Sequence, residues 1–313
     1  MAQCGCKLVG AVVSMLGMLS VLYVQAVRGK CAAPTWFTRT VTTSETRGRS
    51  GVSNAADGCH NVFIDAGSNI GVHFEPEKYP EMKRGVRAVF NKLGKPEQRR
   101  QNTCVFAFEP NPAHAEHQLK TQRIYSGLGW RYHYMPVGVG TEDRVQAFYS
   151  NDKRSKGKTH EHWGFSHANY DGEVGEEKEK FELQSVDFTK WLQQVVMQRE
   201  LPQDSVSAWG KPKVVVKMDI EGAEMTLLPK MLTAGVLCEL DVLFGEWHAR
   251  HPEAEVQLIF PDNRTIQSTI AFSRDLLQRI NWLAKRTACT TFLELDDEGY
   301  LHDEVPYPTL PPT

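Results

Sequence analysis

Four acidic side chains stand out because each one follows a short run of apolar residues. They are Asp65, Glu109, Asp219 and Glu246. The preceding runs are rich in β-branched and aromatic residues, which predicts buried strands of a parallel sheet. The carboxyl ends of parallel strands meet at one edge of the sheet, where open α/β sheets bind their ligands. We therefore expect an acid-lined crevice at that edge.

Two glycines follow the first acid, and together they predict a cofactor-facing turn. Gly67 and Gly71, with Asn69 between them, would let the backbone approach a ligand closely. Their spacing is not that of the pyrophosphate-binding G-x-G-x-x-G motif, and no P-loop lysine follows. The alternative is that these glycines only shape a strand–turn–helix connection.

The acid after the second strand is suited to binding a ribose. A carboxylate in the position of Glu109 can accept both ribose hydroxyls, although a plain surface acid is the alternative. A cofactor with a ribose and a positive charge, but without a phosphate, fits these features. S-adenosylmethionine is such a cofactor, with Asp65, Gly67, Asn69, Gly71, Glu109 and Asp219 as the predicted binding residues.

Candidates for proton transfer follow the later strands. Asp219 is the first candidate for a base or for orienting an acceptor hydroxyl, and Glu246 and His248 come next. An ordinary histidine has a pKa of about 6.5, which suits a base, but a histidine packed at a strand end is an equal alternative. Glu224 has a simpler explanation, because acids favour the first turn of a helix.

A metal site is not expected. His160 and His162 form a His-x-His pair, but no clear third ligand accompanies them. They lie in the highly charged segment 151–180, which we interpret as a long loop and as a candidate lid over the substrate.

The elements that must position these side chains alternate along the chain. Helical patterns separate the strands, including one over residues 186–197 and one that Ser273 is expected to cap. This alternation predicts an α/β fold with a doubly wound, mostly parallel sheet.

Three segments resemble the FkbM-type methyltransferases. They are residues 65–71 (DAGSNIG), 106–111 (FAFEPN) and 217–224 (KMDIEGAE). The resemblance covers roughly residues 58–308 and implies a class I, Rossmann-like methyltransferase fold. It also implies a late antiparallel hairpin at the sheet edge, near residues 289–305, and S-adenosylmethionine near Asp65, Gly67 and Glu109. The expected reaction is O-methylation of a hydroxyl on a glycan or small metabolite.

Other functions stay open at this stage. A nicotinamide-dependent oxidoreductase is disfavoured by the glycine spacing, whereas a membrane-tethered binding module without catalysis would keep the same fold. A glycosyltransferase shares the expected chain layout. The net charge of -2 over 313 residues gives no indication of a nucleic-acid partner.

The amino end predicts a membrane anchor. Residues 8–27 are uncharged and apolar, and about 20 such residues can cross a bilayer as a helix. A cleaved signal peptide is the alternative. We expect an anchor over residues 1–30, a flexible stem over 31–57 and the methyltransferase domain over 58–313.

Two orientations in the membrane stay open. The basic residues after the anchor favour a cytosolic domain, whereas the anchor-and-stem layout favours the lumen of the ER or Golgi. The sequon at Asn263 would be used only in the lumen. Cys104 and Cys238 lie in apolar runs and are expected to be packed thiols.

Overall fold

The computed structural model describes residues 54–69, 93–150, 165–167, 179–248, 266–287 and 289–294. All of them belong to one compact unit, Val52–Thr313. The expected anchor, nearly all of the expected stem, Gly71, the His160–His162 pair and Asn263 lie outside the described residues. No helix in the part of the chain that is described is long and apolar enough to span a membrane.

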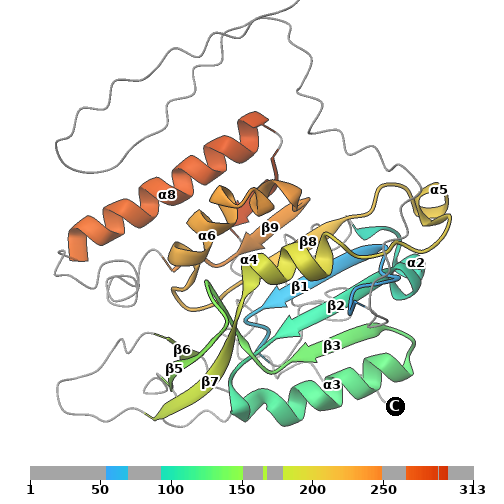
Figure 1. The fold of residues 1–313 in the computed structure, drawn as a ribbon, viewed down its shortest axis with the longest axis horizontal. Helices are drawn as coiled ribbons and strands as arrows, with labels where there is room; N and C mark the ends of the chain where they lie inside the picture. Colours follow the sequence, from blue (N-terminus) through green and yellow to red (C-terminus); the bar gives the residue numbers. More distant parts are fainter. Residues whose placement is uncertain are drawn as a thin grey trace, which may run out of the picture. The chain divides into compact units, whose positions relative to one another are not determined.

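A six-stranded parallel sheet forms the centre of the fold, in the order β10-β9-β8-β1-β2-β3 (Figure 1). Its strands are β1 (Asn61–Ala66), β2 (Thr103–Phe108), β3 (Arg131–Met135), β8 (Val214–Met218), β9 (Val242–Gly245) and β10 (Thr291–Glu294). The order reverses direction between β1 and β8, which is where such sheets bind ligands. The doubly wound parallel sheet predicted from the sequence is confirmed.

Both faces of this sheet are covered, so its central strands are buried throughout. Side chains of alternate residues enter two separate cores. One core contains Val62, Ile64 and Val216, packed against α4 (Phe188–Trp191) and α6 (Glu224–Thr233). The other contains Phe63 and Val215. It also takes in Tyr125 of α3 (Ala115–Gly127).

The remaining helices connect or flank these layers. They are α2 (Pro96–Asn102), the short turn η3 (Pro112–His114), η5 (Leu192–Val196), α5 (Ser205–Trp209), η6 (Val236–Glu239) and α8 (Ile266–Thr287). The helix predicted over residues 186–197 is formed by α4 and η5 together. Ser273 was expected to cap a helix but lies inside α8, because the helix already begins at Ile266.

The last described strand lies at the sheet edge where a hairpin was expected. β10 pairs in parallel with β9, from Thr291–Val242 to Glu294–Gly245. The antiparallel return strand would follow Glu294 and falls outside the described residues, so that part of the hairpin stays a prediction.

A second, smaller sheet stands beside the ligand-binding edge, in the order β4-β7-β5-β6. It consists of β4 (Gly138–Gly140), β5 (Arg144–Ser150), β6 (Phe165–Ser166) and β7 (Lys180–Asp187). β5 runs antiparallel to both β6 and β7. The segment 151–180 was expected to be a loop throughout, and β6 corrects that expectation.

Two disulfides correct the prediction of packed thiols. Cys59 bonds to Cys104, and Cys238 bonds to Cys289. Each bond joins cysteines far apart in sequence, with separations of 45 and 51 residues. A local spacing pattern therefore could not predict these two bonds.

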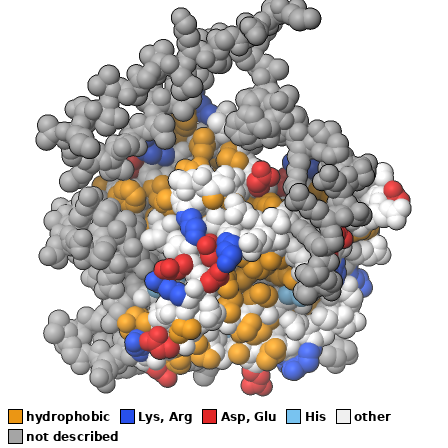
Figure 2. Space-filling model, viewed as in Figure 1, with side chains coloured by type: hydrophobic (Ala, Val, Ile, Leu, Met, Phe, Trp, Pro, Cys, Tyr) orange, Lys and Arg blue, Asp and Glu red, His pale blue; other side chains and the backbone are white. Residues whose placement is uncertain are grey.

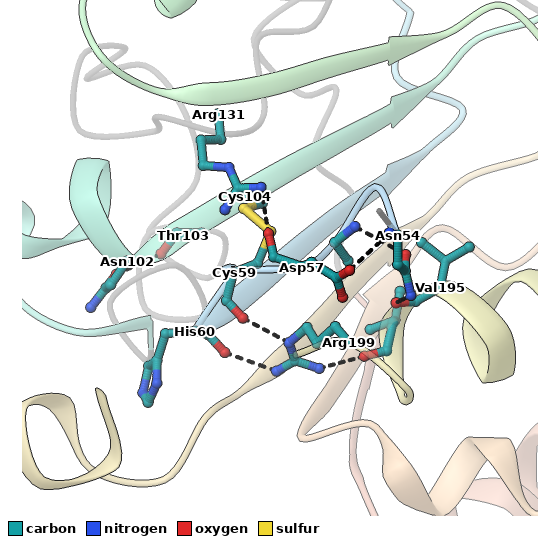
Figure 3. Close-up of a disulfide and its surroundings, with 12 residues drawn as sticks. Asn54, Asp57, Cys59, His60, Asn102, Thr103, Cys104, Arg131, Val195 and Arg199 are labelled. Carbon is teal, nitrogen blue, oxygen red and sulfur yellow. Dashed lines mark hydrogen bonds between the residues drawn. A yellow bond between two sulfur atoms is a disulfide. The ribbon is translucent and has the colours of Figure 1, made fainter. Parts of the chain in front are cut away.

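The first disulfide lies within a set of contacts that fastens the start of the domain (Figure 3). Arg199 donates to the carbonyls of Cys59, His60 and Val196 at 2.6–2.8 Å. The side-chain amide of Asn54 donates to the carbonyl of Val195 at 3.0 Å. The folded contacts therefore begin slightly before residue 58, where we expected the domain to start.

Charges of both signs are interspersed on the face drawn in Figure 2. Exposed ion pairs of the protein include Lys190–Asp143 at 2.7 Å and Arg144–Glu142 at 2.8 Å. Such exposed pairs contribute little to stability. The expected absence of a nucleic-acid partner stays a prediction.

Candidate functional site

A pocket lies at the carboxyl ends of β1, β2 and β8, between the main sheet and the second sheet. The main-sheet side is formed by the loops that follow these strands, and the second sheet supplies an aromatic wall. Its lining comprises Gly67, Asn69, Phe108, Glu109, Pro110, His114, Gly138, Val139, Phe148, Phe165, His167, Asp219, Ile220 and Glu221. Four of the residues predicted to bind the cofactor therefore share one pocket, namely Gly67, Asn69, Glu109 and Asp219.

Gly67 is required where the loops after β1 and β8 touch. A Cβ atom at this position would lie only 1.7 Å from the carbonyl oxygen of Asp219, and the φ angle is +76°. The amides of Gly67 and Ser68 both donate to the carbonyl of Phe108 at 3.0 Å. The loop after β1 is thus held against the ends of both neighbouring strands.

Glu109 fastens two loops while it lines the pocket. Its carboxylate accepts from the amide of Asn69 and from the amide of Asn111, each at 2.8 Å. Asn69 has a φ of +48°, which is uncommon outside glycine. Each carboxylate oxygen has a further lone pair, so the geometry leaves capacity for ligand hydroxyls.

Lys217 is a buried cation at the site that we did not predict from the sequence. Its Nζ donates to the carbonyl of Gly67 at 2.8 Å and lies 3.4 Å from Asp219 and 3.7 Å from Asp65. Lys217 is opposite Asp65 in the β1–β8 register, and residue 219 follows two places later on the same side. The sequence did contain one indication of this buried cation, which is a lysine at the fourth position of a strand otherwise formed by valines and a methionine. Asp65 itself is buried and contacts the pocket residues through Lys217.

His248 is buried between three carboxylates. Its Nδ1 lies 3.1 Å from Glu224, and its Nε2 lies 3.6 Å from Glu221 and 3.7 Å from Asp219. Burial opposes a charge on the ring, but the three carboxylates, Glu224 first, outweigh it and raise the pKa of His248 well above the usual 6.5. The sequence left open a base and a histidine packed at a strand end; the side chain is buried there, and a role as base stays a prediction.

Glu224 has two roles, of which only one was predicted from the sequence. Its carboxylate accepts from the amides of Ile220 and Gly222 at 2.8 and 2.9 Å, as expected for an acid at a helix start. It also contacts His248, and its side chain is fully buried. The partner comes 24 residues later in the chain, so local sequence patterns did not indicate it.

Among the predicted site residues, Asp65 and His248 lie behind the pocket lining and contact its residues, Asp65 through Lys217. Glu246, by contrast, follows β9 and is partly buried, and it is not among the residues that line the pocket. The position of Gly71 lies outside the described residues.

Asp219, Glu224 and His248 are close enough together to be considered as metal ligands, with one ligand atom of each within 4.8 Å of the others. However, His248 directs Nδ1 at Glu224 and Nε2 at Asp219 and Glu221. These contacts also form an ion-pair chain, in which both ring nitrogens of His248 face carboxylates. The expectation that no metal is needed stays a prediction.

The second sheet covers the pocket with uncharged aromatic groups. Phe148 stacks on Phe165 at 5.5 Å and contacts the ring of His167 at 4.1 Å between centroids. Burial, reinforced by Arg144, lowers the pKa of His167 to about 4. The ring is therefore neutral at physiological pH, and this wall gives the pocket a flat, uncharged surface.

The arrangement of strand-end acids and a glycine turn can be compared with known families. The family model described as Methyltransferase FkbM domain matches residues 65–285. The chain belongs to the FkbM methyltransferase family. The match includes the glycine turn after β1, the strand-end acids and the 217–224 segment, and it confirms the resemblance noted from the sequence.

A search of curated proteins finds no match for the chain. Among solved structures, it is similar to methyltransferase FkbM from Methylobacillus flagellatus KT, with 14% identity and a TM-score of 0.32. That match covers 70% of this chain and 37% of the bacterial chain. The chain described here therefore spans little more than a third of the length of the bacterial protein.

Proposed function

We propose that the protein transfers a methyl group from S-adenosylmethionine to a hydroxyl oxygen of a glycan or small metabolite. The observation that carries this proposal is the interlocked contact between the glycine turn at Gly67 and the strand end at Asp219, inside a pocket that also contains Glu109. Membership of the FkbM family supports the methyl transfer, and the pocket supports the choice of donor.

The charge of the site suits a cationic donor. Among the described residues, the buried ion-pair chain joins four carboxylates, Asp65, Asp219, Glu221 and Glu224, to two cations, Lys217 and His248. The remaining negative charge favours a positive ligand. Glu109 would hold the ribose hydroxyls, and Gly67 and Asn69 would border the rest of the donor.

The bound donor would supply a methyl group already activated on a sulfonium, so the protein must mainly orient the acceptor. Asp219 lines the pocket and, as a carboxylate, can accept a hydrogen bond from the acceptor hydroxyl. This carboxylate, or water, would accept the hydroxyl proton as the oxygen takes the methyl carbon and the carbon's bond to sulfur breaks. Asp219 is thus the favoured orienting group and base, ahead of Glu246.

Turnover with a panel of hydroxyl acceptors tests the proposal. The full chain, in detergent, should transfer labelled methyl to a glycan or metabolite hydroxyl, and Asp219→Asn should lower kcat by about 10²–10⁴-fold. Donor binding without turnover on any acceptor would favour a tethered binding module. Preference for a nicotinamide cofactor would instead favour the oxidoreductase alternative.

We also propose that the domain faces the lumen of the secretory pathway. Two disulfides support this orientation, because disulfides persist in oxidising compartments and are rare in the cytosol. Protease protection of the domain in intact microsomes, together with glycan attachment at Asn263, would support it. Digestion of the domain without opening the membrane would contradict it.

A further inference from the structure

We propose that His248 is a positioning residue, held by Glu224, that fixes the carboxylates of Asp219 and Glu221 at the pocket and does not itself remove the acceptor's proton. The expected effect of His248 on kcat rests on the proposed methyl transfer. The expected protonation state of His248 rests only on its contacts with the three carboxylates.

The two ring nitrogens of His248 face carboxylates on opposite sides. Glu224 lies on the Nδ1 side, and Asp219 and Glu221 lie on the Nε2 side. A neutral imidazole has one donor and one acceptor nitrogen, so it would turn a lone pair toward one of these carboxylates. A ring with both nitrogens protonated satisfies both sides, and a ring in that state has no lone pair with which to accept a proton.

His248 also lies behind the residues that line the pocket. Asp219 and Glu221 belong to the lining, whereas His248 does not and is 5% exposed. An acceptor hydroxyl in the pocket would therefore meet the carboxylates before the imidazole. Contact with substrate belongs to Asp219 and Glu221, and His248 acts through them.

The conformation of Glu221 is fixed from two directions. Its φ is +54°, a conformation that costs a non-glycine residue free energy and that persists where surrounding contacts impose it. The hydroxyl of Ser166 in β6 donates to its carbonyl at 2.7 Å, and its side chain contacts His248. The second sheet and His248 therefore hold this acid at the pocket together.

In the described part of the chain, the charged groups around the ring belong to α6, to the loop after β8 and to β8 itself. Glu224 belongs to α6, Asp219 and Glu221 to the loop after β8, and Lys217 of β8 lies on the far side of Asp219. Among the residues that the structure describes, the charged groups in contact with the ring are negative, which agrees with the raised pKa of His248.

The decisive measurement is the protonation state of His248 in the full chain, by nitrogen-15 NMR with labelled histidine. His248→Gln assigns the signal by its loss. We expect both ring nitrogens to be protonated at pH 7, and we expect Glu224→Gln to move the titration to lower pH by more than one unit. A neutral wild-type ring at pH 7 would overturn the proposal, whether or not the protein has turnover.

Two further variants separate this electrostatic effect from misfolding. Glu221→Gln changes a partly exposed acid and should lower the titration midpoint by a smaller amount. Asp275→Asn neutralises an exposed acid on α8, paired with Arg279, and should leave the midpoint unchanged. If Asp275→Asn and Glu224→Gln shifted the titration midpoint of His248 equally, that result would contradict the contact between His248 and Glu224.

The kinetic readout distinguishes positioning from base catalysis. If His248 must stay charged, kcat falls as pH rises through its pKa, and Glu224→Gln moves that fall to lower pH. A base would give the opposite sign, with kcat rising through the same pKa. Loss of activity on adding EDTA, restored by a divalent cation, would also overturn the proposal in favour of a metal site.

Discussion

At the scale of single residues, the site depends on charged groups that are buried together. Lys217 is fully buried between Asp65 and Asp219, and it also donates to the backbone at Gly67. Charges removed from water in this way need their partners, since an uncompensated buried charge is costly. The same lysine therefore contributes to the shape of the pocket and to stability.

Replacing this lysine should destabilise the fold strongly. Lys217→Met keeps much of the side-chain volume but removes a buried cation from beside Asp65 and Asp219, so we expect a loss of about 3–5 kcal/mol in the free energy of unfolding. Urea denaturation measures this loss. Lys190→Met is the matched control, because Lys190 forms an exposed pair with Asp143 and should cost no more than about 1 kcal/mol. Equal losses in the two variants would contradict the structure.

Gly67 offers a second test at this scale, with a closely matched control. Gly67→Ala places a methyl group 1.7 Å from the carbonyl oxygen of Asp219, so the two loops must separate. Gly210 has a similar φ of +81°, but a Cβ atom there would have no neighbour within 4 Å, so Gly210→Ala isolates the backbone strain, about 1–2 kcal/mol. We expect calorimetry to show donor binding weakened at least tenfold in Gly67→Ala and unchanged in Gly210→Ala. Normal binding by Gly67→Ala would argue against this contact.

At the scale of elements, the sequence predicted the parts of the fold whose signals are local. Buried strands ending in Asp65, Glu109 and Asp219 were visible as apolar runs, and their parallel pairing places these acids along one sheet edge. The crossover helix over residues 186–197 was visible in the same way. The pattern of apolar residues within each of these elements is enough to predict it from the sequence.

The features that the sequence did not predict depend on partners distant in the chain. Glu224 looked like an ordinary helix-start acid until His248 was placed beside it. Likewise, β6 consists of only two residues and is recognisable only by its pairing with β5. Periodicity says nothing about which distant segments meet, and this is also why the disulfides were missed.

The first disulfide ties two central strands together at their starts, and its removal tests that role. Cys59 lies just before the start of β1, and Cys104 lies near the start of β2. Replacing Cys59 and Cys104 together with alanine should lower the free energy of unfolding by about 2–4 kcal/mol, through the loss of a covalent constraint on the unfolded chain. Denaturation of the oxidised protein measures the difference. A loss at least as large is expected in fully reduced wild-type protein, and no difference between oxidised and reduced protein would contradict the bond.

At the scale of the whole molecule, the methyltransferase domain combines a parallel sheet with a small second sheet beside its ligand edge. The main sheet supplies the acids, and the second sheet supplies Phe148, Phe165 and His167 to the opposite wall. In the proposed function, the main sheet would hold the donor and the second sheet would shape the space left for the acceptor. No cysteine of the two disulfides is among the residues that line that pocket.

The central claim is that the strand-end acids form a donor site, and a calorimetric titration of the full chain with S-adenosylmethionine tests it most directly. We expect micromolar binding by the wild-type protein and at least tenfold weaker binding by Glu109→Gln, which keeps the size of the side chain and removes its charge. Asp275→Asn should bind like the wild type, since this acid lies on the exposed surface of α8. A folded wild-type protein that does not bind S-adenosylmethionine would contradict the account.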